Sequence, residues 1–585
     1  MNFTVTDHNN SDVSGMNSTV TLTERPYEGH DGVTLVSVDV KFEEPRVPEH
    51  ITVRWYIPCV DIYSSFSPSS MYDRTIGPSW RKRRTSSRLA SGAPVHQLIS
   101  SDGRNRMTVA LSDAMTPCEI ATGVHEKSAC VECEVRFFTS PVNTLSEYHA
   151  VIYIDFSDRR YDLSLKAADR FWQEECGYPC AYIPDTARRP LYSCWYSFHQ
   201  SIDVDAIVHQ CELAKAMGME SVIVDDGWQC DDKNGGYAYC GDWEAVPSKV
   251  PDMKEFVERV HGTGMKFILW YSVPAVGIHS RAYQRFRDKL LNPSAANWAS
   301  LDPRFPDVRE YLTGIYTDAV KNWGLDGLKL DFIDSFRLSS ETPAFDERWD
   351  TLSLEEAVDR LLSEVTSALR AINPDILIEF RQSYFGPVIR KYGNMIRVGD
   401  CPNDSLRNHV AGVDLRYMLG VTAVHSDMLI WHPEDKVEAA AYQVICTLFS
   451  VPQISVLLDR IPDDHRRMLT HYLGFWNRHR DTLLDGELTA EHPEELYSLV
   501  RADKDGETVA VSFSDPLLEL GDFSSVFHVN ATGREMTAAR FEKDGGMRRY
   551  VITDCTGKVT EEGEFLQTRG LREFRVPRSG MVEIH

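Results

Sequence analysis

Carboxylates recur in this sequence where short apolar segments end. Asp331 lies near the end of the segment 327–332, and the adjacent pair Asp225 and Asp226 follows the apolar run 222–224. A carboxylate at the end of a buried strand is costly unless it is paired or takes part in function. Adjacent carboxylates also repel one another. These residues are therefore the first candidates for catalytic or ligand-binding groups.

Two of these carboxylates fit the division of labour that glycoside hydrolysis requires. One carboxyl group must stay ionised beside the anomeric carbon, and another must hold a proton for the leaving oxygen. Lys329 precedes Asp331 by two residues, so both face the same side of an extended strand, and the lysine favours an ionised Asp331. Asp331 therefore suits the nucleophile. Asp400, which follows Arg397 by three residues, is the candidate acid.

The remaining candidates are those of a monosaccharide pocket. Aromatic faces cover sugar C–H surfaces, while carboxylates, lysine and arginine bond hydroxyl groups. Each tryptophan taken singly is more typical of a core than of a ligand contact. The further candidate binding residues are Trp195, Trp228, Trp270, Glu379, Arg381, Arg397 and Asp404.

Several of these residues have a second interpretation. Asp404 could cap a helix, yet it also competes with Asp400 for the acid role. Cys401 could be a nucleophile, although no Cys–His arrangement supports it. His425 and His432 could suggest a metal site, but a spaced partner pair is missing. We therefore expect no metal.

The candidates need a scaffold that brings strand ends together. From residue 191 onward, short apolar strands alternate with amphipathic helices, which is typical of βα units and a parallel sheet. Eight strands are expected at residues 191–195, 221–225, 266–271, 327–332, 376–380, 395–398, 420–424 and 454–457. Eight such units predict a (β/α)8 TIM barrel, in which these strand ends form the active-site face.

The connecting helices carry ordinary start and stop signals. Asp203 can cap a helix that Gly218 closes, and Ser353 with Glu356 makes a capping-box pattern. The helix before the central strand, at about 308–323, has apolar residues at helical spacing.

Strand patterns occupy both flanks of the barrel and predict three domains. Residues 1–160 predict an N-terminal β-sandwich, residues 161–482 the barrel with a leading helical linker, and residues 483–585 a small antiparallel C-terminal β-domain. The basic run 80–84 predicts a solvated loop; the alternative is a loop that reaches the catalytic mouth.

Composition narrows the classes of partner. The chain has 585 residues and a formal net charge of -25, which argues against a nucleic-acid or anionic-membrane partner. We expect a neutral small-molecule substrate, an oligosaccharide or glycoconjugate, and a homo-oligomer is compatible with the sequence.

Location follows from what the sequence lacks. No apolar run reaches the roughly 18 residues of a membrane span, and no signal peptide is visible. The 13 cysteines therefore predict reduced thiols in the cytoplasm. Cys130 and Cys133 form one CxxC pair without the second pair of a zinc site.

Taken together, motifs over roughly residues 190–460 resemble the α-galactosidases of glycoside hydrolase family 36 and, more distantly, family 27. The motifs are Ser193-Cys-Trp195, Val224-Asp225-Asp226-Gly-Trp228, Gly241-Asp-Trp243 with Lys249-Val-Pro, Gly264-Met-Lys-Phe-Ile-Leu-Trp270, Lys329-Leu-Asp331 and Arg397-Val-Gly-Asp400.

The resemblance implies a retaining exo-glycosidase that hydrolyses terminal α-galactosides by double displacement, with no metal or organic cofactor. Asp331 would attack C1, and Asp400 would act first as acid and then as base. The implied galactose contacts are Asp225 and Asp226 to O4 and O6, Lys329 to O3 and O4, Trp195 as the floor, and Arg381 with Arg397 near O2.

The sequence departs from the family pattern at strand 3 (271–275), at strand 5 (379–383) and directly after Asp400. The first two departures bear on the O2 substituent and leave α-N-acetylgalactosaminidase, or galactosyl transfer to another sugar, as alternatives. The third leaves Asp404 as the alternative acid. A non-catalytic carbohydrate-binding barrel and a metal-dependent barrel hydrolase are alternatives from other classes.

Overall fold

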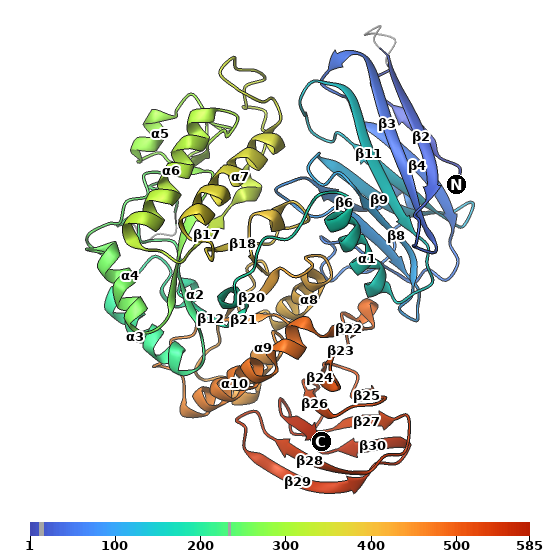
Figure 1. The fold of residues 1–585 in the computed structure, drawn as a ribbon, viewed down its shortest axis with the longest axis vertical. Helices are drawn as coiled ribbons and strands as arrows, with labels where there is room; N and C mark the ends of the chain where they lie inside the picture. The colour runs from blue at the N-terminus through green and yellow to red at the C-terminus, as the bar shows by residue number, and fades with distance from the viewer. Residues whose placement is uncertain (11–16, 232–235) are drawn as a thin grey trace.

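The computed structural model describes residues 1–10, 17–231 and 236–585. A central barrel carries β-sheets on two sides (Figure 1). The N-terminal strands, in blue, lie beside the barrel, and the C-terminal strands, in red, lie at one end of the molecule. The predicted combination of a TIM barrel with flanking β-domains is confirmed.

Eight parallel strands close the barrel in sequence order. They are β12 (Leu191–Ser193), β13 (Ser221–Val224), β14 (Lys266–Ser272), β17 (Gly327–Asp331), β18 (Leu377–Arg381), β19 (Met395–Arg397), β20 (Ala423–Leu429) and β21 (Val451–Ile454). Register brings candidate residues together, because Lys329 pairs with Trp270 on one side and with Glu379 on the other. Arg381 pairs in turn with Arg397.

The last two barrel strands do not lie where the sequence predicted them. The predicted strand 420–424 is in fact β20, which begins at Ala423, and the predicted 454–457 is β21, which ends at Ile454. Strand β20 was obscured because His425, Ser426 and Asp427 are polar and yet fully buried in it. Pro452 and Gln453 interrupt the apolar pattern of β21 in the same way.

The α-helices include the two whose caps were predicted from the sequence, at Asp203 and Ser353. The helices are α1 (Tyr161–Glu174), α2 (Trp195–Phe198), α3 (Val204–Ala216), α4 (Met253–Gly262), α5 (Arg281–Arg285), α6 (Pro306–Trp323), α7 (Leu354–Ile372), α8 (Ser405–Arg416), α9 (Val437–Ile445) and α10 (Asp463–Asp485). The Asp203 carboxylate accepts the Ala206 N–H at 3.0 Å and caps α3. The Ser353 hydroxyl likewise accepts the Glu356 N–H at 3.2 Å and caps α7.

The N-terminal strands form two packed antiparallel sheets, ordered β1-β4-β10-β9-β6 and β2-β3-β11-β8-β7-β5. Their bounds are β1 (Thr4–Asp7), β2 (Ser18–Pro26), β3 (Val33–Arg46), β4 (Ile51–Pro58), β5 (Ser64–Phe66), β6 (Arg83–Ser87), β7 (Val95–Ile99), β8 (Asn105–Leu111), β9 (Cys118–His125), β10 (Cys130–Phe137) and β11 (Leu145–Asp155). Alternate residues such as Val36, Val38 and Ile152 fill the space between the sheets.

The basic run 80–84 lies on this sandwich. Trp80 is exposed, and the Lys82 ammonium pairs with Glu132 at 2.8 Å and with Glu134 at 2.7 Å. Local glutamates therefore balance part of its charge. The run is not a loop throughout, because Arg83 and Arg84 begin strand β6, whose later residues reach the barrel, as described below.

The C-terminal strands form a seven-stranded sheet, β22-β23-β24-β26-β31-β28-β29, and a three-stranded sheet, β25-β27-β30. Their bounds are β22 (Glu487–Glu491), β23 (Leu499–Lys504), β24 (Glu507–Ser512), β25 (Leu517–Leu520), β26 (Ser525–Asn530), β27 (Thr537–Phe541), β28 (Met547–Thr553), β29 (Val559–Leu566), β30 (Gly570–Phe574) and β31 (Met581–Ile584). The pairs β24–β26 and β25–β27 are parallel, so the sheets are mixed and not wholly antiparallel.

The three-domain division remains a prediction, and its boundary at residue 482 lies within the last turn of α10. Two short strands outside the barrel, β15 (Ala275–Gly277) and β16 (Trp298–Ser300), pair antiparallel after β14. Across the described ranges, no helix is long and apolar enough to cross a membrane.

Candidate active site

The Asp331 carboxylate lies at the end of β17 and is held by four donors. Its Oδ1 accepts hydrogen bonds from the Arg381 Nε at 2.8 Å, the Phe332 N–H at 2.7 Å and the Tyr384 hydroxyl. Its Oδ2 accepts one, from the Trp270 indole N–H at 3.0 Å. The two oxygens therefore differ in how many hydrogen bonds they accept: Oδ1 accepts three and Oδ2 accepts one.

These contacts keep Asp331 ionised. Burial alone would raise the pKa of this carboxyl, because a charged group loses hydration. The positive charges of Arg381 and Lys329, together with the hydrogen bonds from Tyr384 and Trp270, outweigh burial and hold the pKa well below its usual range. The surroundings of Asp331 thus favour its ionised form.

Asp400 follows β19, and its environment differs from that of Asp331. Its side chain is 52% exposed, and its Oδ1 accepts a hydrogen bond from the Arg397 Nη2 at 2.8 Å. Burial raises the pKa of Asp400, but the positive charges of Arg397, Lys329 and Arg381 outweigh burial, so that the pKa is lowered overall. The charge of Arg381 also acts on Asp331, so the two candidate carboxylates lie around one guanidinium.

Both carboxylates of the pair after β13, Asp225 and Asp226, have hydrogen-bond or ion-pair partners. The Asp225 Oδ2 pairs with the Lys329 ammonium at 2.6 Å, and both side chains are buried. Asp226 accepts hydrogen bonds from Gln200 and Gln229, each at 2.6 Å. Burial raises the pKa of Asp226 to about 6, because these amides offset only part of the lost hydration.

Glu379 lies inside the barrel between cations. Its Oε2 accepts a hydrogen bond from the Gln453 amide at 2.5 Å, and its Oε1 lies 3.8 Å from the Arg397 Nε. Burial raises the pKa of Glu379 to about 6, although Lys329 and Arg397 oppose the shift. Arg397 also pairs with Asp427, so a continuous set of polar side chains lies beneath the two candidate carboxylates.

The three candidate tryptophans lie in different surroundings. Trp270 is the one that contacts Asp331, and its ring stacks with Tyr237 at a centroid distance of 6.1 Å. Trp228 is fully buried and donates its N–H to the Trp270 carbonyl at 3.0 Å, which is a core contact. Trp195 is half-buried in α2 and stacks on His199 at 4.5 Å.

Asp404 has a structural function in this arrangement. Its Oδ1 accepts the Arg407 N–H at 3.0 Å and so caps α8, while its Oδ2 accepts the Tyr72 hydroxyl at 3.0 Å. It differs from Asp400, which lines the cavity described below. The geometry favours Asp400 as the acid, and the assignment stays a prediction.

The surroundings of Cys401, His425 and His432 do not favour a thiolate nucleophile or a metal site. Burial raises the pKa of the Cys401 thiol well above its usual range, which opposes a thiolate nucleophile. His425 is buried with Nε2 2.7 Å from the Ala187 carbonyl, whereas His432 is exposed beside Glu434. Over residues 1–10, 17–231 and 236–585, no three His, Cys, Asp or Glu side chains gather closely enough to hold a metal ion.

Several contacts of the site were not predicted from the sequence. Tyr384 lies in the loop after β18, and no spacing pattern links it to Asp331. Gln200 and Gln229 hold Asp226, although glutamine carried no signal in the motifs. Asp427 was not among the candidate residues, and it accepts hydrogen bonds from the Cys401 N–H at 2.6 Å and the Tyr196 hydroxyl at 2.8 Å.

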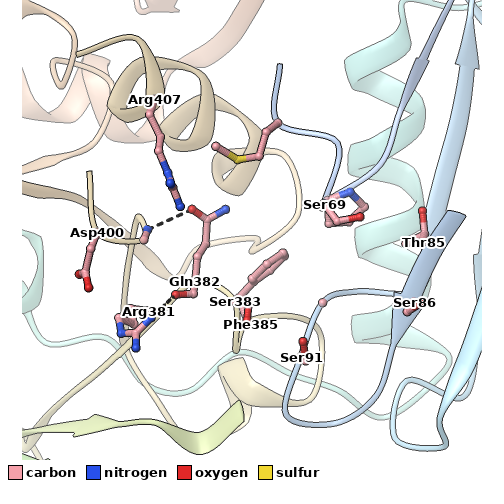
Figure 2. Close-up of a pocket in the computed structure, with 14 residues that line it drawn as sticks. Ser69, Thr85, Ser86, Ser91, Arg381, Gln382, Ser383, Phe385, Asp400 and Arg407 are labelled. Carbon is pink, nitrogen blue, oxygen red and sulfur yellow. Dashed lines mark hydrogen bonds between the residues drawn. The ribbon is translucent and has the colours of Figure 1, made fainter. Parts of the chain in front are cut away.

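A cavity of about 490 Å³ opens beside Asp400, between the barrel and the N-terminal sandwich (Figure 2). The Gly92 N–H donates to the Ser383 carbonyl at 2.9 Å and joins the two walls. Figure 2 shows Ser69, Thr85, Ser86 and Ser91 opposite Arg381, Asp400 and Arg407. Thr85 and Ser86 follow the basic run and line this cavity, but none of residues 80–84 is among its described lining residues.

Comparison with known proteins agrees with this geometry. The Melibiase family model matches residues 183–383. The α-galactosidase Mel36A of Lactobacillus acidophilus is 28% identical over 155 residues, which are 26% of this chain and 20% of that protein. The A type blood α-D-galactosamine galactosaminidase of Flavonifractor plautii is 26% identical over 171 residues, 26% of this chain and 15% of that protein.

The crystal structure of the family 36 α-galactosidase AgaA from Geobacillus stearothermophilus superposes with a TM-score of 0.66 at 15% identity, covering 97% of this chain and 81% of that chain. At that identity the likeness concerns the fold. The sequence matches span a fifth or less of the length of these two curated relatives. The chain is therefore similar to family 36 α-galactosidases, with the sequence similarity confined to part of it.

Proposed function

We propose that this chain, which resembles the α-galactosidases of glycoside hydrolase family 36, hydrolyses terminal non-reducing α-galactosides with retention of configuration. The observation that carries the proposal is the Asp331 carboxylate, held ionised by Arg381 and Trp270 beside a second carboxylate, Asp400. Two carboxyl groups in different environments are what a glycosidic bond requires for cleavage.

In the first step, the Asp331 Oδ2 attacks the anomeric carbon and forms a covalent glycosyl-aspartate. The C1–O bond breaks, and Asp400 gives its proton to the departing oxygen, so that a neutral alcohol leaves. We assign the attack to Oδ2 because it accepts only one hydrogen bond, whereas Oδ1 accepts three.

In the second step, Asp400, now a carboxylate, takes a proton from water, and the water oxygen attacks C1. The C1–Oδ2 bond breaks, which frees the sugar with its original configuration and returns Asp331 to its ionised form. The half-exposed position of Asp400 supports this role, because water must reach it.

Sugar recognition would come from the buried polar residues around these two groups. Asp225 and Asp226 would accept hydrogen bonds from hydroxyls O4 and O6, and Lys329 would donate to O3 and O4. Trp195 would form the floor, and Arg381 with Arg397 would lie near O2. Trp228, Glu379 and Asp404 would act by supporting their neighbours, through the contacts described above.

Galactose is favoured over N-acetylgalactosamine at the O2 side. The nucleophile attacks C1, and C2 is bonded to C1. A side chain that is hydrogen-bonded to the nucleophile therefore also lies near the substituent on C2. Arg381 is such a side chain, and its guanidinium offers hydrogen-bond donors to a hydroxyl. The similarity to a galactosaminidase over part of the chain keeps the amino-sugar alternative open to test.

Aryl α-galactoside and aryl α-N-acetylgalactosaminide assayed side by side test the proposal. We expect faster cleavage of the galactoside, with the α anomer as the first product seen by NMR. Turnover of the N-acetyl substrate alone, or a β first product, would contradict it. Binding without turnover would instead support a carbohydrate-binding protein. Inhibition by a chelator would support a metal-dependent hydrolase.

Galactosyl transfer is a second outcome on the same intermediate. A high concentration of an acceptor sugar would reveal it as a disaccharide product.

We also propose the cytoplasm as the location, supported by the free thiols of all 13 cysteines. Cell fractionation tests this.

A further inference from the structure

We propose that the cavity beside Asp400 binds the leaving group of the substrate, and that Arg407 makes it prefer leaving groups that carry an anionic substituent, a carboxylate or a phosphate. This inference rests on the proposed function, because a leaving-group site requires that Asp400 protonate the glycosidic oxygen. It adds a class of substrate to that function.

The position of the cavity supports the first half of the proposal. A general acid must lie within hydrogen-bond reach of the oxygen that it protonates, so the group attached to that oxygen lies on the acid's side. Asp400 and Arg381 both line this cavity. Its volume of about 490 Å³ is within the ordinary range for a small-molecule site.

The balance of charge in the cavity supports the second half. Arg381 pairs with Asp331 at 2.8 Å, and Asp400 pairs with Arg397 at 2.8 Å, so these charges have partners. The Arg407 guanidinium lines the cavity but makes no ion pair and no side-chain hydrogen bond with the residues that the structure describes. Its Nε is buried and without a partner.

The neighbouring carboxylate does not neutralise Arg407. Asp404 lies three residues earlier, but its oxygens accept the Arg407 backbone N–H and the Tyr72 hydroxyl. In Figure 2, the Arg407 side chain extends from α8 toward Gln382, and it lies between the loop that carries Gln382 and the loop that carries Asp400. The Nη2 atom would lie 3.2 Å from a Cβ placed on Gly399, so the guanidinium rests against the backbone beside Asp400.

The rest of the lining is neutral. Among the described residues that line the cavity, Asp400 is the only carboxylate, and it is uncharged when it acts as the acid. The uncharged lining includes the hydroxyls of Ser69, Thr85, Ser86 and Ser91 and the apolar side chains of Met71 and Phe385. These groups suit a sugar or aryl ring, but they leave one positive charge without a partner.

A half-buried cation without a partner is costly, and an anion on the ligand removes that cost. Guanidinium groups bind carboxylate and phosphate through two parallel hydrogen bonds, whereas a neutral hydroxyl leaves the charge uncompensated. The protein as a whole carries a formal charge of -25, so an anionic ligand would be repelled without a local cation. Arg407 supplies that cation.

The test compares aryl α-galactosides that differ only in one substituent of the ring, a carboxylate, its neutral carboxamide or a phosphate monoester. The readout is the kcat/KM ratio of each anionic substrate to the carboxamide. We expect both ratios to exceed one in the unmodified protein. In Arg407→Gln they should fall by about ten-fold or more, because a charge-assisted hydrogen bond is lost.

Two further variants separate this effect from a general one. Arg407→Lys keeps the charge and should retain part of the preference. Arg104→Gln removes an exposed arginine that pairs with Asp158 on the N-terminal sandwich, and should leave the ratios unchanged. The larger of the two ratios identifies carboxylate or phosphate as the preferred anion.

The outcomes separate this inference from the proposed function. Hydrolysis of the carboxamide with ratios at or below one, or ratios that Arg407→Gln does not change, would overturn the anion preference and leave the hydrolase intact. No hydrolysis of any of the three α-galactosides would remove both.

Discussion

At the scale of single residues, the proposed function depends on carboxylates with the same chemistry in unlike surroundings. Asp331 is surrounded by donors and cations that hold its pKa well below the usual range. Asp400 is half exposed and faces a cavity, where substrate and water change its surroundings. Binding of a leaving group there would displace water, weaken the hydration of the charged form and favour the proton that an acid must carry.

Replacing Asp400 by asparagine tests the acid role. For an alkyl or disaccharide α-galactoside, we expect kcat/KM to fall by about 10²–10⁴-fold, because the leaving oxygen loses its proton donor. For an aryl substrate with a good leaving group, kcat/KM should change little, while kcat falls because the second step lacks its base.

Asp404→Asn is the matched control for that experiment, since it changes a nearby carboxylate in the same way. It should show no dependence on the leaving group. If Asp404→Asn shows the dependence and Asp400→Asn does not, the two assignments must be exchanged.

Glu379 gives a prediction about pH. Its pKa is raised from 4.5 to about 6, so between these values the folded protein binds more protons than the unfolded chain. This contribution to stability is full below about pH 4.5 and is lost as the pH rises through about 6. The loss corresponds to about 2 kcal/mol.

Comparison with Glu379→Gln isolates this contribution from that of Asp226, which titrates in the same range. The free energy of unfolding of the unmodified protein minus that of the variant should decline between about pH 4.5 and about pH 6. Urea denaturation over this range measures it, and a constant difference would show that the pKa of Glu379 is not raised.

At the scale of elements, local signals located most of the barrel. Cap residues such as Asp203 and Ser353 mark helix starts through short-range hydrogen bonds, which the sequence displays directly. Strand β13 was equally visible, because its Val222, Ile223 and Val224 form a continuous apolar run. Strand β20 was misplaced because His425 and Asp427 are buried with partners from distant segments, Ala187 and Arg397. Such partners depend on tertiary structure, which periodicity does not report.

The cap of α3 can be tested by substitution. Asp203→Ala removes the acceptor of the Ala206 N–H, and we expect a loss of about 1 kcal/mol in the free energy of unfolding. Asp205→Ala is the control, because it removes a carboxylate of the same helix turn that is 88% exposed and pairs only with Arg259 on the surface. It should cost less, and an equal loss in chemical denaturation would mean that the cap contributes only its charge.

At the scale of the whole molecule, the three parts of the chain meet at α8. The Arg74 side chain comes from the N-terminal sandwich, pairs with Asp414 of α8 at 2.9 Å and lies beside the Tyr497 ring of the C-terminal part. The cavity beside Asp400 is lined by Arg407 of the same helix and by residues of the N-terminal part. Its N-terminal wall could not be predicted, because no sequence pattern links Ser69 or Thr85 to a barrel loop some 300 residues away.

The buried pair at this junction should matter for stability. Asp414→Asn leaves the Arg74 guanidinium buried without its carboxylate, and we expect a loss of about 3–5 kcal/mol. Removing one partner of the exposed pair Arg540–Glu519 by Glu519→Gln should cost about 1 kcal/mol or less. Thermal and urea unfolding measure both, and similar losses would show that the junction does not stabilise the assembly of the three parts.

The central claim is that Asp331 becomes covalently bonded to the sugar. A fluorinated galactosyl donor that forms the intermediate and slows its hydrolysis, followed by trypsin and tandem mass spectrometry, tests it most directly. Cleavage after Lys329 and Arg337 yields the peptide Leu330–Arg337, which contains Asp331 and Asp334. We expect one added sugar, on Asp331. A label on Asp334 or Asp400, or inactivation with no label, would contradict it.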